Sequence, residues 1–247
     1  MKGIILAGGS GQRLSPLTRV TNKHLLPVYD RPMIYYAVEQ LADAGLDRIM
    51  IVTGGNHAGE FLRLLGSGSQ FGLRHLDYAY QERAGGIAEA LGLTEYFAGG
   101  DPVVVLLGDN IFEYSIAPIV DRFRSSPVGA RLVLAEVSNP QEYGVAVMDG
   151  NRLVRIVEKP AEPPSNVVVT GLYLYDAGVF EVVKTLKPSA RGELELTDVN
   201  NRYLQEGRLS YEVAPGYWAD CGESIDTLLE VNNLVAKRGA NKREVPA

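Results

Sequence analysis

Residues 3–13 read Gly3-Ile4-Ile5-Leu6-Ala7-Gly8-Gly9-Ser10-Gly11-Gln12-Arg13. The apolar run from Gly3 to Ala7 predicts a buried strand, and the glycines from Gly8 to Gly11 predict a tight loop directly after it. Because glycine has no side chain, backbone N–H groups in such a loop can approach a phosphate closely. The loop is therefore a candidate anion-binding site, and the alternative is a plain strand-to-loop turn.

Strands and helices alternate after this loop. Apolar periodicity predicts a helix over Pro32–Ala44, and its apolar positions are Met33, Ile34, Ala37, Val38 and Leu41. Further strands are expected at Ile49–Thr53 and Val103–Leu107, and further helices at Ala58–Leu65 and Ala88–Phe97. This order predicts an α/β fold with a Rossmann-like, mostly parallel mixed sheet flanked by helices.

The pattern changes after Pro140. Asp149-Gly150-Asn151 is a hairpin turn between the expected strands Val145–Met148 and Leu153–Val157. Another strand is expected at Val167–Tyr175, followed by helices at Glu195–Gln205 and Ser224–Ala236 and a frayed polar tail at Gly239–Ala247. The second half of the sheet is therefore expected to be antiparallel.

Composition limits the class of protein. The 247 residues suit one domain, and the net charge of −6 with a pI of about 5.2 argues against a nucleic-acid partner. Cys221 is the single cysteine, which excludes an internal disulfide. No export signal and no apolar stretch of roughly 20 residues is visible, so we expect a soluble cytoplasmic protein without a membrane partner.

Several other chemistries lack their motifs. A Walker loop needs Lys and then Ser or Thr after its last glycine, and here Gln12-Arg13 follows. A dinucleotide fingerprint would place a small residue where Leu14 stands, which makes a Rossmann dehydrogenase a weak alternative. The three histidines lack metalloprotease spacing, and no Gly-x-Ser-x-Gly elbow exists for a hydrolase.

Asp109 is a candidate Mg²⁺ ligand on position alone. It follows the apolar strand that ends at Leu107, and parallel sheets hold their ligands beyond the carboxyl ends of the strands. A carboxylate suits Mg²⁺, which uses few protein carboxylates together with substrate phosphates. The alternative is an aspartate in an ordinary loop turn.

Residues 3–14, followed by Lys23-His24-Leu25-Leu26-Pro27-Val28, closely resemble the N-terminal signature of the sugar-phosphate nucleotidyltransferase family, specifically its glucose-1-phosphate thymidylyltransferases. The resemblance covers nearly the whole chain. It continues at Gln81 with 85–90, 106–110, Tyr143-Gly144-Val145, Glu158-Lys159-Pro160, 169–173, 189–193 and Trp218-Ala219-Asp220-Cys221-Gly222.

The resemblance implies transfer of a nucleotidyl group from dTTP to glucose 1-phosphate with Mg²⁺, giving dTDP-glucose and pyrophosphate. It implies that Asp109 and Asp220 hold the metal and that Arg13 and Lys159 are catalytic. The implied nucleotide-binding residues are Leu6, Gly8, Gly9, Gly11, Arg13, Lys23, Gln81, Gly86 and Asp109. The implied sugar-phosphate-binding residues are Asn110, Tyr143, Gly144, Glu158, Lys159, Val169, Gly171 and Arg191.

The implied sites divide the single domain 1–247 into a nucleotide-binding half (1–140) and a sugar-phosphate-binding half (141–238). Glu158 and Lys159, adjacent on a predicted strand, are expected to point to opposite faces of the sheet. His24 stands where many longer thymidylyltransferases carry Gln, so a UTP-preferring enzyme, or one that uses another sugar phosphate, is the nearest alternative. A catalytically idle sugar-nucleotide-binding module is a further alternative. We also expect a homo-oligomer (dimer or tetramer) of the short form, without feedback inhibition at a distant site.

Overall fold

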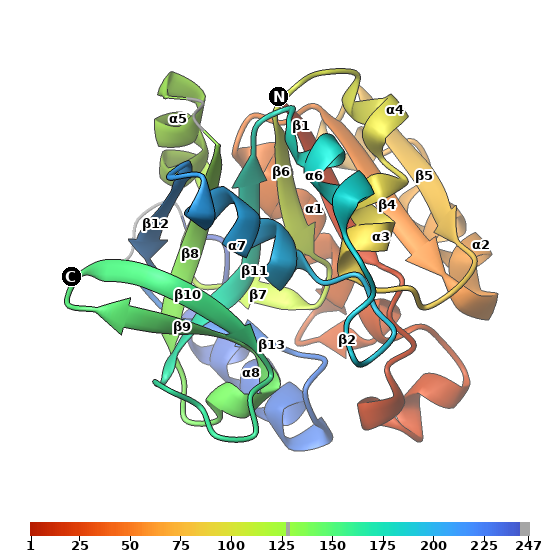
Figure 1. Ribbon diagram of the computed structural model, residues 1–247. Helices are drawn as coiled ribbons and strands as arrows, with labels where there is room; N and C mark the ends of the chain where they lie inside the picture. The colour runs from red at the N-terminus through yellow and green to blue at the C-terminus, as the bar shows by residue number, and fades with distance from the viewer. Residues whose placement is uncertain (127–128, 243–247) are drawn as a thin grey trace.

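The computed structural model describes residues 1–126 and 129–242 (Figure 1). Its strands are β1 (Lys2–Ala7), β2 (Pro27–Val28), β3 (Arg31–Pro32), β4 (Arg48–Gly54), β5 (His75–Gln81), β6 (Val103–Leu107), β7 (Asn110–Phe112), β8 (Ala130–Glu136), β9 (Gly144–Asp149), β10 (Arg152–Glu158), β11 (Val167–Tyr175), β12 (Leu209–Val213) and β13 (Trp218–Asp220). Its α-helices are α1 (Met33–Asp43), α2 (Ala58–Leu65), α3 (Ile87–Gly92), α4 (Glu95–Ala98), α5 (Ala117–Ser125), α6 (Val179–Thr185), α7 (Leu196–Gln205) and α8 (Ile225–Arg238).

A block of parallel strands forms the first half of the main sheet. β1 pairs in parallel with β4 and β6, and β4 pairs in parallel with β5, so the order is β6-β1-β4-β5. Every residue of β1 is buried, which explains the continuous apolar run from Gly3 to Ala7. The carboxyl ends of these strands lie at one edge of the sheet, where ligands of α/β folds bind.

The second half joins the same sheet in the antiparallel direction. β11 pairs antiparallel with β6, β8 and β9, and β9 pairs with β10 through the predicted hairpin, in which Gly150 has φ of +57°. This confirms the mixed sheet and its antiparallel portion. β12, which pairs in parallel with β8, is a strand that the sequence pattern did not predict.

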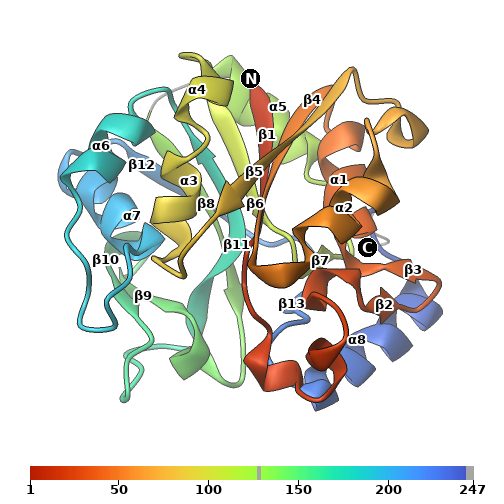
Figure 2. The ribbon, with the colours of Figure 1, turned by 90° about the vertical axis from the view of Figure 1, so that its right-hand side faces the viewer.

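Helices cover both faces of the sheet. Figures 1 and 2 show α3, α6 and α7 on one face and α1 and α2 on the other. Each face has its own apolar core, one centred on residues such as Ile5, Val38 and Phe61 and the other on residues such as Ile4, Leu91 and Tyr175. The five predicted apolar positions of α1 are all buried, which confirms that helix and its orientation.

A third apolar cluster lies at the carboxyl edge of the parallel block. There α8 packs against β2 and against the small antiparallel sheet of β7 and β13 (Figure 2). The register of that sheet pairs Asp220 with Asn110 and Trp218 with Phe112. The sheet therefore brings the end of the chain next to the residues that follow β6.

Two local predictions need correction. The predicted helix Ala88–Phe97 is two helices, α3 and α4, because the first ends at Gly92, a poor helix former, and the Thr94 hydroxyl donates a hydrogen bond to the Leu91 carbonyl (2.7 Å) between them.

The predicted frayed tail does not begin at Gly239. The Asn241 carboxamide accepts a hydrogen bond from Gln40 Nε2 (3.0 Å) and donates one to the Tyr36 carbonyl (3.0 Å), and Lys242 lies 3.4 Å from Glu113. These contacts hold residues 239–242 on the protein, while 243–247 lie outside the described residues. None of the described helices is both long and apolar enough to span a membrane.

Candidate active site

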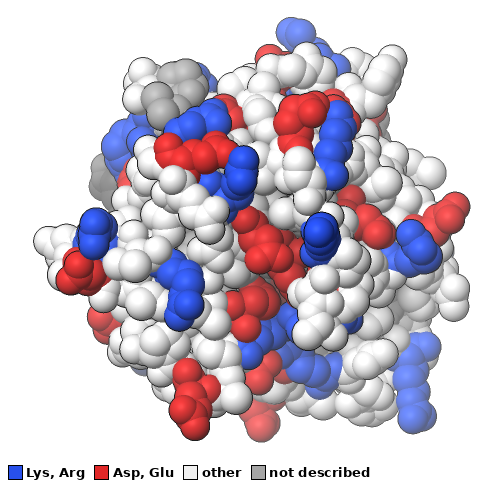
Figure 3. Space-filling view, viewed as in Figure 1, with Lys and Arg blue, Asp and Glu red and all other residues white. Residues whose placement is uncertain are grey.

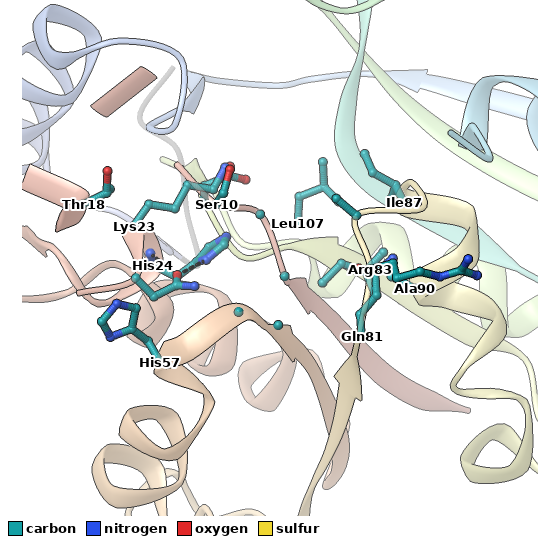
Figure 4. Close-up of a pocket in the computed structure, with 18 of the residues that line it drawn as sticks. Ser10, Thr18, Lys23, His24, His57, Gln81, Arg83, Ile87, Ala90 and Leu107 are labelled. Carbon is teal, nitrogen blue, oxygen red and sulfur yellow. Dashed lines mark hydrogen bonds and ion pairs between the residues drawn. The ribbon is translucent and has the colours of Figure 1, made fainter. Parts of the chain in front are cut away.

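A cavity of about 530 Å³ lies at the carboxyl edge of the parallel strands. The loops that follow β1, β4, β5 and β6 all contribute to its walls. Figure 4 shows Lys23 and His24 on one side of the cavity and Gln81, Ile87 and Leu107 on the other. Seven of the residues predicted to bind nucleotide line it, namely Leu6, Gly8, Gly9, Lys23, Gln81, Gly86 and Asp109.

Gln81 has a fixed orientation in this cavity. Its Nε2 donates to the Gly86 carbonyl (3.1 Å) and to Glu89 Oε1 (3.2 Å), both of which are acceptors. Oε1 therefore faces the opposite way, 3.0 Å from the position that a Cβ on Gly8 would occupy. Gly8 is needed here because any side chain would press on the carboxamide.

A second cavity of about 170 Å³ adjoins the first and shares Lys23, Leu107 and Asp109 with it. Figure 3 shows acidic and basic side chains gathered around a hollow near the middle of the same face as Figure 1. All eight residues predicted to bind the sugar phosphate line this smaller cavity, namely Asn110, Tyr143, Gly144, Glu158, Lys159, Val169, Gly171 and Arg191.

Glu158 and Lys159 line the same cavity, so the expectation that they point to opposite faces is wrong. The strand β10 ends at Glu158, and Lys159 has a left-handed backbone conformation with φ of +40°. This turn breaks the alternation of the strand, so that Lys159 lies at the cavity together with Glu158. The Lys159 N–H donates to the Tyr143 carbonyl (3.0 Å), and the Thr197 hydroxyl donates to Glu158 Oε2.

Arg191 is surrounded by carboxylates at the mouth of the smaller cavity. Its guanidinium lies 2.7 Å from Glu193, 3.4 Å from Glu158 and 3.5 Å from Glu195. Burial raises the pKa of Glu195, although Ser189 donates a hydrogen bond to it and Arg191 is close. These groups hold Arg191 in place, and a bound phosphate would have to compete with them.

Arg13 lines the smaller cavity and forms an ion pair with Glu142 (2.7 Å). This pair links the glycine loop after β1 to the second half of the sheet. Gly11, with φ of +66°, forms the turn that leads to Arg13, and a Cβ there would lie 2.8 Å from side-chain atoms of Lys23 and Thr18. Gly11 therefore serves the shape of the loop.

Lys23, Asp109 and Asp220 meet at the junction of the two cavities. Lys23 Nζ is paired with Asp109 Oδ2, and both groups are largely buried. A Cβ on Gly222 would lie 2.7 Å from Lys23 Nζ, 2.7 Å from Asp109 Oδ2 and 3.1 Å from Asp220 Oδ1. The three charged groups thus surround one small volume that glycine leaves open.

The two carboxylates have opposite electrostatic environments. Burial raises the pKa of Asp109, but Lys23 and the hydrogen bond from Asn110 outweigh burial and hold it well below its usual range. Burial and the neighbouring Asp109 raise the pKa of Asp220 to about 7. Burial lowers the pKa of Lys23, yet the two aspartates together raise it overall, so the ammonium stays charged.

His24 is buried beside this cluster. Burial and the adjacent Lys23 lower its pKa to about 3, so the imidazole is neutral. Asn22 Oδ1 accepts the His24 backbone N–H (3.0 Å) and lies 2.7 Å from Nδ1. Nδ1 therefore carries the proton, because a carboxamide oxygen can only accept.

The structure adds site residues that sequence reasoning missed. Gly222 follows the predicted Asp220 and leaves the open volume, and Glu142 holds Arg13. The loop from Gly54 to His57 lines the larger cavity beside Gly8 and Gln81. Its signal was available, because Gly54-Gly55 follows a predicted strand, as Gly8-Gly9 does.

Comparison with known proteins gives one consistent family. Residues 2–238 match the family described as nucleotidyl transferase. A glucose-1-phosphate thymidylyltransferase from Actinoplanes sp. is 45% identical over 240 residues, which cover 96% of this chain and 78% of that protein.

Two solved structures share the fold. One is a Bacillus anthracis protein assigned to glucose-1-phosphate thymidylyltransferase, in complex with a sucrose. It is 50% identical to this chain with a TM-score of 0.91, and the match covers 99% of this chain and 98% of the Bacillus anthracis chain. A UDP-glucose pyrophosphorylase complexed with UDP-glucose is 25% identical with a TM-score of 0.82 over 96% of this chain and 98% of its own. With two adjoining cavities that meet at Lys23 and Asp109, and with this match over nearly its full length, the chain belongs to the nucleotidyl transferase family.

Proposed function

We propose that this enzyme transfers a thymidylyl group from dTTP to glucose 1-phosphate and releases pyrophosphate. The observation that supports this most directly is the pair of adjoining cavities, one lined by the glycine loop and Gln81 and the other by Glu158, Lys159 and Arg191. A nucleotide and a sugar phosphate bound in them would meet beside Lys23 and Asp109. The named activity of the Actinoplanes relative agrees with this pairing of substrates.

Asp109 and Asp220 suit a Mg²⁺ ion. Their oxygens border the open volume at Gly222. Burial and the neighbouring Asp109 raise the pKa of Asp220, and a divalent cation would relieve the repulsion between the two carboxylates. Among the described residues there is no group of three or more His, Cys, Asp or Glu side chains that could hold a metal, so water, or phosphates when a substrate is bound, would complete the coordination. The bound ion would neutralise phosphate charge.

The side chains then have distinct roles. Lys159 and Arg191 orient the phosphate of glucose 1-phosphate, whose oxygen forms the new bond to the α-phosphorus. The bond from the α-phosphorus to the bridging oxygen breaks, and its electron pair leaves with pyrophosphate. Lys23 and Arg13 supply positive charge to the triphosphate and the leaving group. No covalent enzyme nucleophile is needed.

The orientation of the Gln81 carboxamide suits recognition of a uracil or thymine base. Its Nε2 is already engaged, so Oε1 is free to accept the imide N–H of either pyrimidine, whereas N3 of cytosine has no hydrogen to offer. The thymine methyl adds burial of about one carbon, on the order of 0.8 kcal/mol. A UTP-preferring enzyme is therefore the second candidate, and the fold shared with UDP-glucose pyrophosphorylase favours it over a dehydrogenase.

Several broader expectations stay predictions. These are the division into halves at about residue 140, the homo-oligomer and the cytoplasmic location. A single sheet that runs from β10 to β5 supports treating the chain as one domain, because β11 pairs directly with β6 across the two halves.

A pyrophosphate-release panel tests the proposal. Five nucleoside triphosphates are crossed with several sugar 1-phosphates in the presence of Mg²⁺, and we expect the highest kcat/KM for dTTP with glucose 1-phosphate, followed by UTP. No release with any pair would favour the idle binding module. Tight NAD(P)H binding in a fluorescence titration would instead favour a dehydrogenase.

A further inference from the structure

Asn110 connects Asp109 to the indole of Trp218. The Asn110 Oδ1 accepts hydrogen bonds from the Gly171 backbone N–H (2.9 Å) and from Trp218 Nε1–H (2.6 Å). Both partners are donors only, so the atom that faces them must be oxygen. The Asn110 amide group therefore faces Asp109, and its Nδ2 donates to Asp109 Oδ1 (2.9 Å).

Both Asp109 oxygens are thereby oriented. Oδ1 accepts from Asn110, and Oδ2 is paired with Lys23 and borders the open volume at Gly222. Asn110 is 3% exposed, and its carboxamide is engaged on both sides by protein. This arrangement suits a group that holds Asp109 better than it suits a group that binds the sugar.

Trp218 is itself held in place. It is buried on β13, whose register places Asp220 opposite Asn110. Trp218 and Asp220 are two positions apart on this strand, so their side chains leave it on the same side. The ring of Tyr143 meets the indole edge-on at 5.4 Å, and the Tyr143 hydroxyl donates to Glu223. One short strand therefore carries one proposed metal ligand and the group that orients the other.

We propose that Trp218 is a positioning residue: its indole N–H, through the Asn110 carboxamide, fixes the Asp109 carboxylate in the orientation that a divalent cation shared with Asp220 requires. Without the N–H donor, Asn110 Oδ1 keeps only Gly171, and the carboxamide can rotate away from Asp109. The inference rests on the proposed metal site at these two aspartates.

The test compares Mn²⁺ binding to nucleotide-free protein, followed by the electron paramagnetic resonance signal of free Mn²⁺. Trp218→Phe keeps an aromatic ring against Tyr143 and removes the N–H. We expect its Mn²⁺ dissociation constant to rise about tenfold, the lower end of the range for groups that orient metal ligands. The matched control is Tyr36→Phe, which removes a hydrogen bond of a buried aromatic side chain to the Val28 carbonyl (2.8 Å). Neither residue lines either cavity, so this variant should bind Mn²⁺ as the wild type does.

A second variant tests the same role if Trp218→Phe does not fold. Trp218 is the only tryptophan in the chain, so growth on benzothienylalanine replaces its N–H by sulfur at this position alone while keeping the bicyclic shape. In steady-state kinetics both variants should raise the half-saturating metal concentration more than the KM of glucose 1-phosphate, because the indole acts on Asp109.

The outcomes distinguish a failure of the positioning role of Trp218 from a failure of the metal site itself. Unchanged Mn²⁺ affinity in both Trp218 variants, or an equal loss in Tyr36→Phe, would overturn the positioning role. A rise confined to the KM of glucose 1-phosphate would also overturn it, since it would place the indole on the sugar. If wild-type protein binds no Mn²⁺, or if binding survives in Asp220→Asn and Asp109→Asn, the metal site itself is wrong and the inference fails with it.

Discussion

Lys23 and Asp109 form an ion pair at the point where the two cavities meet, with the ammonium and the carboxylate both largely buried. Removing the partner of a buried charge lowers the free energy of unfolding, whereas removing one of two like charges at the same site raises it. Mutation of Asp109 and mutation of Asp220 are therefore expected to change the stability of the protein in opposite directions, although both residues should be needed for turnover.

Asp109→Asn should abolish turnover and also destabilise the protein. The substitution removes the carboxylate that pairs with Lys23 Nζ and leaves Asp220 close to it, so we expect a cost of about 3 kcal/mol, the lower end for a broken buried pair. Urea unfolding at pH 7.5 in EDTA measures the free energy of unfolding, and pyrophosphate release measures turnover. Full stability in this variant would show that Lys23 finds another partner or reaches solvent.

Asp220→Asn should abolish turnover but stabilise the metal-free protein. The folded-state pKa of Asp220 is raised to about 7 from a usual value near 4, so ionisation of this group costs stability as the pH rises through that window. The gain from Asp220→Asn should thus grow between pH 4 and pH 7 in EDTA. Added Mg²⁺ should stabilise the wild type above pH 7 and leave the variant unchanged; a variant less stable than wild type in EDTA would contradict the repulsion between the carboxylates.

Arg13→Ala should lower kcat by roughly two to four powers of ten, because the charge is needed where pyrophosphate leaves. The ion pair with Glu142 is partly exposed, so the free energy of unfolding should change by less than about 1 kcal/mol. Glu142→Gln is the matched control, since it removes the partner and keeps the arginine. An effect of Arg13→Ala limited to the KM of glucose 1-phosphate would place the guanidinium on the sugar phosphate.

Gln81→Ala should weaken selection against CTP. The carboxamide presents Oε1 to the base, and losing that acceptor should reduce the dTTP to CTP ratio of kcat/KM by about tenfold or more. The dTTP to UTP ratio should change little, because both bases carry the same imide. An unchanged ratio of dTTP to CTP would remove Gln81 from base recognition.

Gly222→Ala should block the site sterically. The new methyl carbon would lie 2.7 Å from both Asp109 Oδ2 and Lys23 Nζ, closer than packed atoms come. We expect turnover to fall by roughly a hundredfold or more, as for other changes of about an ångström at reacting groups. Gly59→Ala is the matched control, because Gly59, like Gly222, has no positive φ, while the space around it is open and it lines neither cavity. Normal turnover in Gly222→Ala would mean that no ion occupies this volume.

His24 should destabilise the protein in acid. Its folded-state pKa is lowered to about 3 from an ordinary value of 6.5, so stability is complete above pH 6.5 and is lost as the pH falls toward the folded pKa. At pH 5 the loss from this group is about 2 kcal/mol. His24→Gln should therefore lose less stability than wild type between pH 7.5 and pH 5 in urea titrations. Equal losses in both proteins would show that the imidazole is already exposed to protonation.

The local sequence pattern was sufficient to predict the central elements of the fold. The run from Gly3 to Ala7 is β1, the strand Val167–Tyr175 is β11 as expected, and the glycine loop lies at the carboxyl edge of the sheet. These elements follow from apolar periodicity and from residue types that restrict the backbone, both of which act over a few neighbours. The break between α3 and α4 and the left-handed turn at Lys159 did not follow, because each depends on one local contact or dihedral angle.

The sequence by itself determined the class of fold and the strands β1, β4, β6 and β11, and its resemblance to a family predicted a set of site residues. Only the tertiary structure decided how those residues meet. The pairing of β7 with β13 joins Asp220 to Asn110, and no local pattern specifies a register between segments so far apart in the chain. Burial then gave Asp109 and Asp220 opposite shifts in pKa, because the cost of a charge depends on the solvent and charges around it and not on the residue type.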